Sequence, residues 1–346
     1  MLRPRRLLIL AEGKSGDPHY GKTARGVMRY RPQDVVVVLD SESSAAELEG
    51  FPLVRTVDEA KRYEPTAALV GVATQGGRFP PAWRELLRDC IRAGLDVENG
   101  LHEFISTDEE LASLARDHKV ELRDLRQPPA GLNVPTGANL THSATTILTV
   151  GSDCAIGKMT VSLELDREAR RRGWRSEFVP TGQTGIAIAG WGISVDAVVA
   201  DFIAGAAEQL VLEGVERGGE VLFVEGQGSL LHPGYSGVTL GLIHGSAPHA
   251  YVLCHKAGER FVDENERFPM PPLSELADLH ERMSLIARPA KVLAIALNTR
   301  DLDEAAARRA VAEAEADTGL PADDPVRFGA GKLVDALETS REVGRN

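Results

Sequence analysis

One short segment, Gly151–Lys158 with the sequence GSDCAIGK, limits the folds open to this chain more than any other feature. It matches the GxxxxGK pattern, and it lies between an apolar, β-branched run at Thr146–Val150 and a Leu-, Ala- and Glu-containing run at Lys158–Arg172. A strand, a glycine loop and a helix in this order form an anion site, because backbone amides surround the anion at the positive end of the helix and the lysine adds a charge. The sequence therefore predicts a phosphate-binding loop. The alternative is a tight strand-to-helix turn whose glycines serve packing alone.

We assign contacts with the phosphate-bearing ligand to the whole loop and the residues just after it. These positions are Gly151, Ser152, Asp153, Cys154, Ala155, Ile156, Gly157, Lys158, Met159 and Thr160.

The residue after the lysine departs from the pattern of loops that use magnesium. Those loops carry Ser or Thr there, whereas this chain carries Met159 and has its hydroxyl one position later, at Thr160. One helical step rotates a side chain by roughly 100° about the axis, so Thr160 does not replace the missing metal ligand. We therefore assign no metal ligand. Two ligands of the loop remain possible. One is coenzyme A, held by the amides and Lys158 without a metal, and the other is ATP with Mg²⁺.

The chain is long enough for two domains, since it has 346 residues and 43% apolar residues. Apolar strand-sized runs alternate with helical runs on both sides of the segment QPPAGLNVPTG, whose prolines and glycines exclude a helix or a central strand. Alternation of this kind predicts an α/β fold with mostly parallel sheets. We place the domains at 1–130 and 131–346. Within them we expect a capping box at Thr107–Glu110, a glycine-rich loop at Thr181–Gly190, one helix at about Val195–Glu216, and a strand-end loop at Gln75–Arg78.

Composition narrows the class of protein. The formal net charge of −12 argues against nucleic acid as a partner, because that interaction needs a clustered basic surface. The longest apolar runs are strand-sized, which argues against a membrane span and against a signal peptide. The three cysteines lie far apart, so we expect neither disulfides nor a zinc site. We expect a cytoplasmic homo-oligomer that binds a small-molecule substrate.

A second acidic element follows the loop in the order expected of a P-loop protein. Val221–Glu225 is an apolar strand that ends in a carboxylate, and Gly226–Ser229 forms a turn at the carboxyl end of that strand, where ligands of open α/β sheets bind. We therefore take Glu225 as a candidate catalytic group, although a carboxylate that caps a loop would have the same sequence. His232, just beyond, is a candidate proton carrier, and a structural histidine is its alternative.

Further loop residues are candidates for ligand contacts. Gln183 and Thr184 follow a predicted strand, as do Gly226 and Gln227, and we assign these four to substrate binding. Asn298 ends another buried strand in the sequence NTRD and is a candidate contact for a base. Asp301 in the same sequence is better explained as the N-cap of the following helix.

These segments together resemble a known family, the domain of unknown function 1611. The resemblance rests on Gly151–Thr160, on PTGQTG from Pro180, on VEGQGSL from Val224, and on the spacing of Asp196, Asp201 and Gly205, and it extends to Lys22–Ala24 and Gly100–His102. Met159 also matches the family. The resemblance implies a Rossmann-like N-terminal domain and a P-loop domain, and for some members D-glutamate N-acetyltransferase activity with acetyl-coenzyme A. The P-loop half is also similar to dethiobiotin synthetase, from which Met159 departs.

Three functions follow as hypotheses. In acetyl transfer, Lys158 and the loop amides hold the coenzyme, Glu225 or His232 removes a proton from the amine, and Lys256 or Arg260 pairs with the carboxylates of an acidic amino acid. In an ATP-dependent kinase or ligase, Glu225 or Asp153 organises magnesium, and Asp153 is therefore a third candidate catalytic residue beside Glu225 and His232. In a non-catalytic regulator, the same loop binds a nucleotide without turnover.

Overall fold

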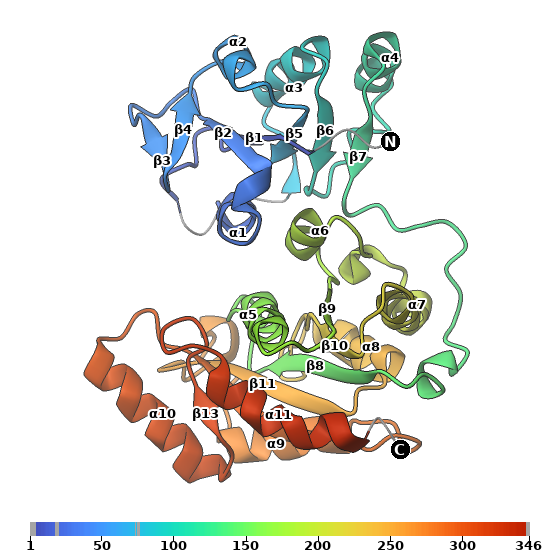
Figure 1. The fold of residues 1–346 in the computed structure, drawn as a ribbon, viewed down its shortest axis with the longest axis vertical. Coiled ribbons are helices and arrows are strands. Elements are labelled where there is room, and N and C mark those ends of the chain that lie inside the picture. The colour runs from blue at the N-terminus through green and yellow to red at the C-terminus, as the bar shows by residue number, and fades with distance from the viewer. Residues whose placement is uncertain (1–4, 18–20, 73, 75–76, 344–346) are drawn as a thin grey trace. The chain divides into compact units, whose positions relative to one another are not determined.

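The computed structural model describes residues 5–17, 21–72, 74 and 77–343 (Figure 1). Gln75 and Gly76 of the expected strand-end loop lie outside the described residues. The chain divides into two compact units, one made of Met1–Gln127 with Gln183–Ser194 and the other of Pro128–Gly182 with Val195–Asn346. A short segment from the middle of the sequence thus packs with the first unit.

The first unit contains a seven-stranded sheet in the order β3-β4-β2-β1-β5-β6-β7, in which only the β3–β4 pair is antiparallel. Its strands are β1 (Leu7–Leu10), β2 (Val35–Leu39), β3 (Glu47–Leu48), β4 (Phe51–Val54), β5 (Ala67–Val70), β6 (Asp96–Asn99) and β7 (Leu122–Asp124). Its helices are α1 (Lys22–Tyr30), α2 (Val57–Ala60), α3 (Trp83–Arg92), α4 (Glu109–His118) and α6 (Gln183–Ala189). All residues of β1 and β5 are buried, as expected of parallel strands covered on both faces.

Two local predictions for this unit are wrong. The expected glycine-rich loop at Thr181–Gly190 contains α6, whose residues from Thr184 to Ile188 are buried in the unit. The expected capping box is also absent, because Asp108 rather than Thr107 caps α4 by accepting the amides of Glu110 and Leu111. A carboxylate one residue later satisfies the same free amides.

The second unit contains a six-stranded parallel sheet in the order β13-β12-β11-β8-β10-β9. Its strands are β8 (Thr145–Gly151), β9 (Ser176–Val179), β10 (Val221–Val224), β11 (Ala250–Lys256), β12 (Lys291–Asn298) and β13 (Ala322–Asp323). Its helices are α5 (Lys158–Arg171), α7 (Ile203–Glu216), α8 (Ser236–Ser246), α9 (Leu273–Arg282), α10 (Glu304–Thr318) and α11 (Gly331–Val343). Helices α5 and α11 contact each other over the sheet, and their apolar residues close one core with side chains such as Phe223 and Val252.

Differences from the expected elements here are local. The single helix expected from Val195 begins as two short 3₁₀ turns, Val195–Ala197 and Ala200–Phe202, before α7. Asp303, not Asp301, caps α10 by accepting the amide of Ala306. Both units have the predicted α/β architecture with mostly parallel sheets. In the described part of the chain, no helix combines the length and the apolar character that crossing a membrane requires.

Candidate functional site

The predicted phosphate loop connects β8 to α5 in the second unit. Gly151 ends the strand, and Lys158 begins the helix. Gly157, just before the helix, has a φ of +113°, which L side chains rarely adopt, so the loop needs a glycine there. Within the described residues no acceptor is seen for the amides of Ala155, Ile156 and Gly157. The loop thus presents backbone N–H groups at the N-terminal end of a helix, which is the arrangement that binds an anion.

The lysine of the loop is buried beside these amides. Lys158 is 6% exposed, and its Nζ donates a hydrogen bond of 2.6 Å to the carbonyl oxygen of Asp153. A Cβ at Gly151 would lie 2.7 Å from Cδ1 of Ile156 and 3.3 Å from this Nζ, so the glycine makes room for the side chains of Ile156 and Lys158. The ammonium group is therefore held over the loop, where it can add charge to an anion site.

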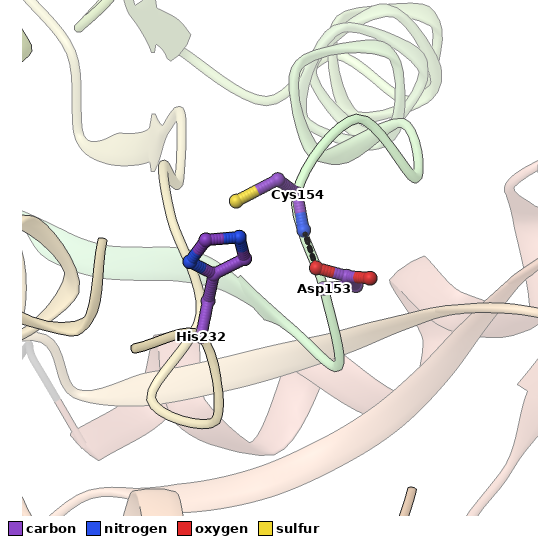
Figure 2. A group of neighbouring side chains, drawn as sticks. All are labelled: Asp153, Cys154 and His232. Atoms are coloured by element: carbon purple, nitrogen blue, oxygen red, sulfur yellow. Dashed lines mark hydrogen bonds between the residues drawn. The ribbon is translucent and has the colours of Figure 1, made fainter. Parts of the chain in front are cut away.

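Figure 2 shows three side chains that meet at the loop, Asp153, Cys154 and His232. One carboxylate, thiol or imidazole atom of each lies within 4.8 Å of those of the others. Asp153 accepts the amide of Cys154 at 2.6 Å and, through its other oxygen, the amide of Asp263 at 2.6 Å. Carboxylate, thiol and imidazole are groups that zinc takes as ligands, so these three side chains could hold a metal ion.

The ring of His232 is oriented by its own turn. Its Nδ1 accepts the amide N–H of Gly234 at 3.0 Å, and the ring stacks on Tyr235 with centroids 4.5 Å apart. An amide can only donate, so Nδ1 is the acceptor in this hydrogen bond. Nε2 of His232 lies 3.8 Å from Oδ2 of Asp263.

A second set of contacts, not foreseen from the sequence, fixes the start of the loop. Ser152 Oγ lies 2.9 Å from Nδ1 of His255, and Ser229 Oγ donates to the carbonyl of Ser152 at 2.9 Å. Burial lowers the pKa of His255 to about 4, so its ring is neutral at physiological pH. His255 lies on β11, and only the pairing of β11 with β8 brings its ring to the loop.

The acidic strand end lies where the sequence predicted it, directly after β10. Glu225 Oε2 accepts the amides of Thr181 and Gly182 at 2.9 and 3.2 Å, and it is 6% exposed. Gly226 donates its amide to Thr149 Oγ1 at 2.9 Å, and a Cβ there would lie 3.2 Å from the side chain of Lys158. Gln227 donates to the carbonyl of Thr181. These contacts hold the Glu225 turn beside the phosphate loop.

Three other candidates are Asn298, Met159 and Thr160. Asn298 donates from Nδ2 to the carbonyl of Ile156 at 3.0 Å, which supports the loop. Met159 is 6% exposed and therefore packs in the interior, while Thr160 is partly exposed.

The remaining candidates are Lys256, Arg260, Gln183 and Thr184. Lys256 lies 3.4 Å from both Glu259 and Asp301, and Arg260 is exposed. Gln183 and Thr184 belong to α6 of the first unit, where Thr184 Oγ1 lies 2.8 Å from Thr23 Oγ1. The structure therefore gathers the loop, Glu225, Gly226, Gln227 and His232 in the second unit and places Gln183 and Thr184 in the first.

Fold and site together define a P-loop protein that carries a Rossmann-like N-terminal domain. Two family models match the chain, "Domain of unknown function (DUF1611_N) Rossmann-like domain" over residues 21–128 and "Domain of unknown function (DUF1611_C) P-loop domain" over residues 133–334. The chain belongs to the DUF1611 family.

Relatives agree with this assignment. The chain is 36% identical over 330 residues to a D-glutamate N-acetyltransferase of Tritonibacter scottomollicae, covering 95% of this chain and 97% of the relative. It is 32% identical over 280 residues to a protein of the same name from a Pseudoalteromonas species, covering 81% of this chain and 83% of the relative. A crystal structure of a DUF1611 family protein from Anabaena variabilis superimposes with a TM-score of 0.89 at 41% identity, covering 97% of this chain and 99% of that one.

Proposed function

We propose that the protein is an N-acetyltransferase that moves the acetyl group of acetyl-coenzyme A to the amine of D-glutamate. Two relatives that align over most of the chain are named D-glutamate N-acetyltransferase. The amine nitrogen attacks the thioester carbonyl, so that a C–N bond forms, the C–S bond breaks, and coenzyme A leaves as a thiolate that takes up a proton.

The observation that carries the proposal is the combination of loop amides that have no acceptor among the described residues with a buried Met159. The amides and Lys158 can hold a pyrophosphate, while the thioether at the metal-ligand position offers magnesium no oxygen. This combination favours coenzyme A over ATP with Mg²⁺. Glu225 is the candidate base for the amine.

The test is an incubation of the purified protein with acetyl-coenzyme A and D-glutamate. We expect release of free thiol together with N-acetyl-D-glutamate by mass spectrometry, and a slower reaction with L-glutamate. Release of ADP from Mg-ATP in place of these products would identify the kinase or ligase alternative. Stabilisation by the ligand without any product would identify a non-catalytic regulator.

A further inference from the structure

A cleft in the first unit lies at the carboxyl ends of three neighbouring parallel strands. It has a volume of about 870 Å³ and is lined by residues that follow β5, β6 and β7, together with the first residue of α6. The polar lining residues are Thr74, Arg78, His102, Glu103, Arg126 and Gln183. Open α/β sheets bind ligands at this edge, so the position itself is one that favours a binding site.

The cleft is built by a buried polar pair that joins β6 to β7. Asn99 donates from Nδ2 to Asp124 at 2.7 Å, and Asp124 in turn accepts the amides of Ile105 at 3.0 Å and Ser106 at 2.9 Å. Asn99 also donates to the carbonyl of Glu103 at 2.8 Å. Buried polar groups satisfied in this way fix the backbone that carries them. The loop with His102 and Glu103 is therefore preorganised.

Glycines keep the cleft open. Gly77 has a φ of +65°, and a Cβ there would lie 2.3 Å from Cδ2 of His102. A Cβ at Gly100 would lie 3.2 Å from the side chain of Gln183. Larger residues at either position would force the lining side chains to move.

The charges of the lining match a small acidic amino acid. Arg126 is 3% exposed and donates to Oε1 of Gln183 at 2.8 Å, so its guanidinium has a fixed orientation. Arg78 is exposed at the rim, and Glu103 is oriented by the amide of Phe79, which it accepts at 2.9 Å. Two cations and one anion complement a molecule with two carboxylates and one ammonium group.

We propose that this cleft binds the acidic amino acid acceptor, with Arg126 and Arg78 at its carboxylates and Glu103 at its ammonium group. The identity of the ligand rests on the proposed function, whereas its chemical class rests on the cleft. Recognition of both carboxylates distinguishes an acidic amino acid from its amide, because a guanidinium pairs with a carboxylate more strongly than with a neutral group.

Calorimetric titration of the full-length protein, with and without saturating coenzyme A, tests the proposal. We expect D-glutamate to bind, and D-glutamine, which lacks one carboxylate, to bind roughly tenfold or more weakly. Arg126→Gln and Arg78→Gln should each weaken D-glutamate binding to a similar extent and leave the affinity for coenzyme A unchanged. Arg116→Gln, at an exposed position on α4, is the matched control and should bind as the wild type does.

Glu103→Gln separates the ammonium contact from the rest of the cleft. The variant should weaken D-glutamate binding but not the binding of glutarate, which has two carboxylates and no amine. Failure of the wild type to bind D-glutamate, or full affinity in both Arg78→Gln and Arg126→Gln, would overturn the proposal. If Arg126→Gln does not fold, the affinity of Arg78→Gln for D-glutamate tests the proposal, because Arg78 is exposed.

The same experiment separates this inference from the proposed function. If D-glutamate binds through the two arginines but no acetyl transfer occurs, the cleft assignment stands and the acetyltransferase assignment is wrong. If acetyl transfer occurs and both arginine variants keep the KM of the wild type for D-glutamate, the activity stands and the acceptor binds elsewhere.

Discussion

Glu225 and Thr181 are joined by reciprocal hydrogen bonds. The Glu225 carboxylate accepts the Thr181 amide at 2.9 Å, and the Thr181 hydroxyl donates to the Glu225 carbonyl at 2.7 Å. The same carboxylate oxygen also accepts the amide of Gly182. Glu225 therefore has a structural role in addition to any catalytic role, and substitutions can separate the two roles.

Glu225→Gln should keep the fold and lose the reaction. An amide oxygen can replace Oε2 as the acceptor of both N–H groups, but a neutral amide cannot take a proton from an amine. We expect an unchanged Tm by calorimetry and a fall of kcat by roughly a hundredfold or more. Glu225→Ala, in contrast, leaves two buried amides without their acceptor and should destabilise the fold by about 1–3 kcal/mol. A fully active Glu225→Gln would show that Glu225 only organises the turn.

If acetyl-coenzyme A binds at the loop as proposed, it should raise the Tm of the wild type, and Lys158→Ala should reduce that rise. Removing a charged donor from a phosphate site weakens binding by roughly tenfold to a hundredfold, which a thermal-shift titration detects. Lys291→Ala is the matched control, because that lysine is 74% exposed and belongs to the same unit. Equal stabilisation of both variants by the coenzyme would place its phosphates away from the loop.

Thiol labelling locates the coenzyme without an activity assay. Burial raises the pKa of Cys90 and of Cys254 to about 12, and burial also raises the pKa of the partly exposed Cys154. Because the thiolate is the reactive form, the native protein should react with N-ethylmaleimide slowly and at Cys154 first. Acetyl-coenzyme A, whose sulfur is acylated, should protect Cys154, and peptide mass spectrometry reads the modified residue. Unchanged labelling at saturating coenzyme would argue against a ligand in the loop.

The sequence predicted the phosphate loop because every element of that prediction is local. The strand before Gly151, the glycine before Lys158 and the helix after it are specified by neighbouring residues, and β8 and α5 have those positions in the structure. The contacts of Ser152 with His255 and Ser229 come from strands and turns distant in sequence, so no local pattern reveals them.

The first unit was harder to predict for a similar reason. Strand β6 has the polar sequence DVEN, and its Glu98 and Asn99 are buried because Arg5 and Asp124 satisfy them. Polar residues usually indicate an exposed segment, but here they are buried because partners across the sheet satisfy them. The sequence does not display this pairing. Likewise, α6 contains a glycine and two isoleucines in seven residues, and burial in the unit rather than helix propensity stabilises it.

Arg126 of the cleft was missed as a candidate binding residue for the same reason. Arg126 immediately precedes the proline-rich segment that we used as the domain boundary, so its sequence context is that of a linker. In the structure it follows β7 and lines the cleft. Only the pairing of β7 with β6 brings it to the edge of the sheet where ligands bind.

Acidification should destabilise the protein below neutral pH, chiefly through buried histidines. Burial lowers the pKa of His280 from 6.5 to about 4; its Nδ1 donates to the carbonyl of Leu276 at 2.8 Å, and its Nε2 has no partner among the described residues. Between pH 6.5 and pH 4, His280 therefore binds a proton in the unfolded chain but not in the folded chain. Stability is full above 6.5 and falls as pH drops toward 4, by on the order of 3 kcal/mol at most for this residue.

His280→Asn tests this contribution, because the Asn amide can replace the Nδ1 donor and does not titrate. Urea unfolding as a function of pH should show a shallower loss of stability for the variant across that window, although His249 and His255, with their pKa values also lowered to about 4 by burial, preserve part of the slope. A slope identical to that of the wild type would mean that His280 is neutral in both states or charged in both. Protonation of the imidazole in the unfolded chain would then not oppose folding.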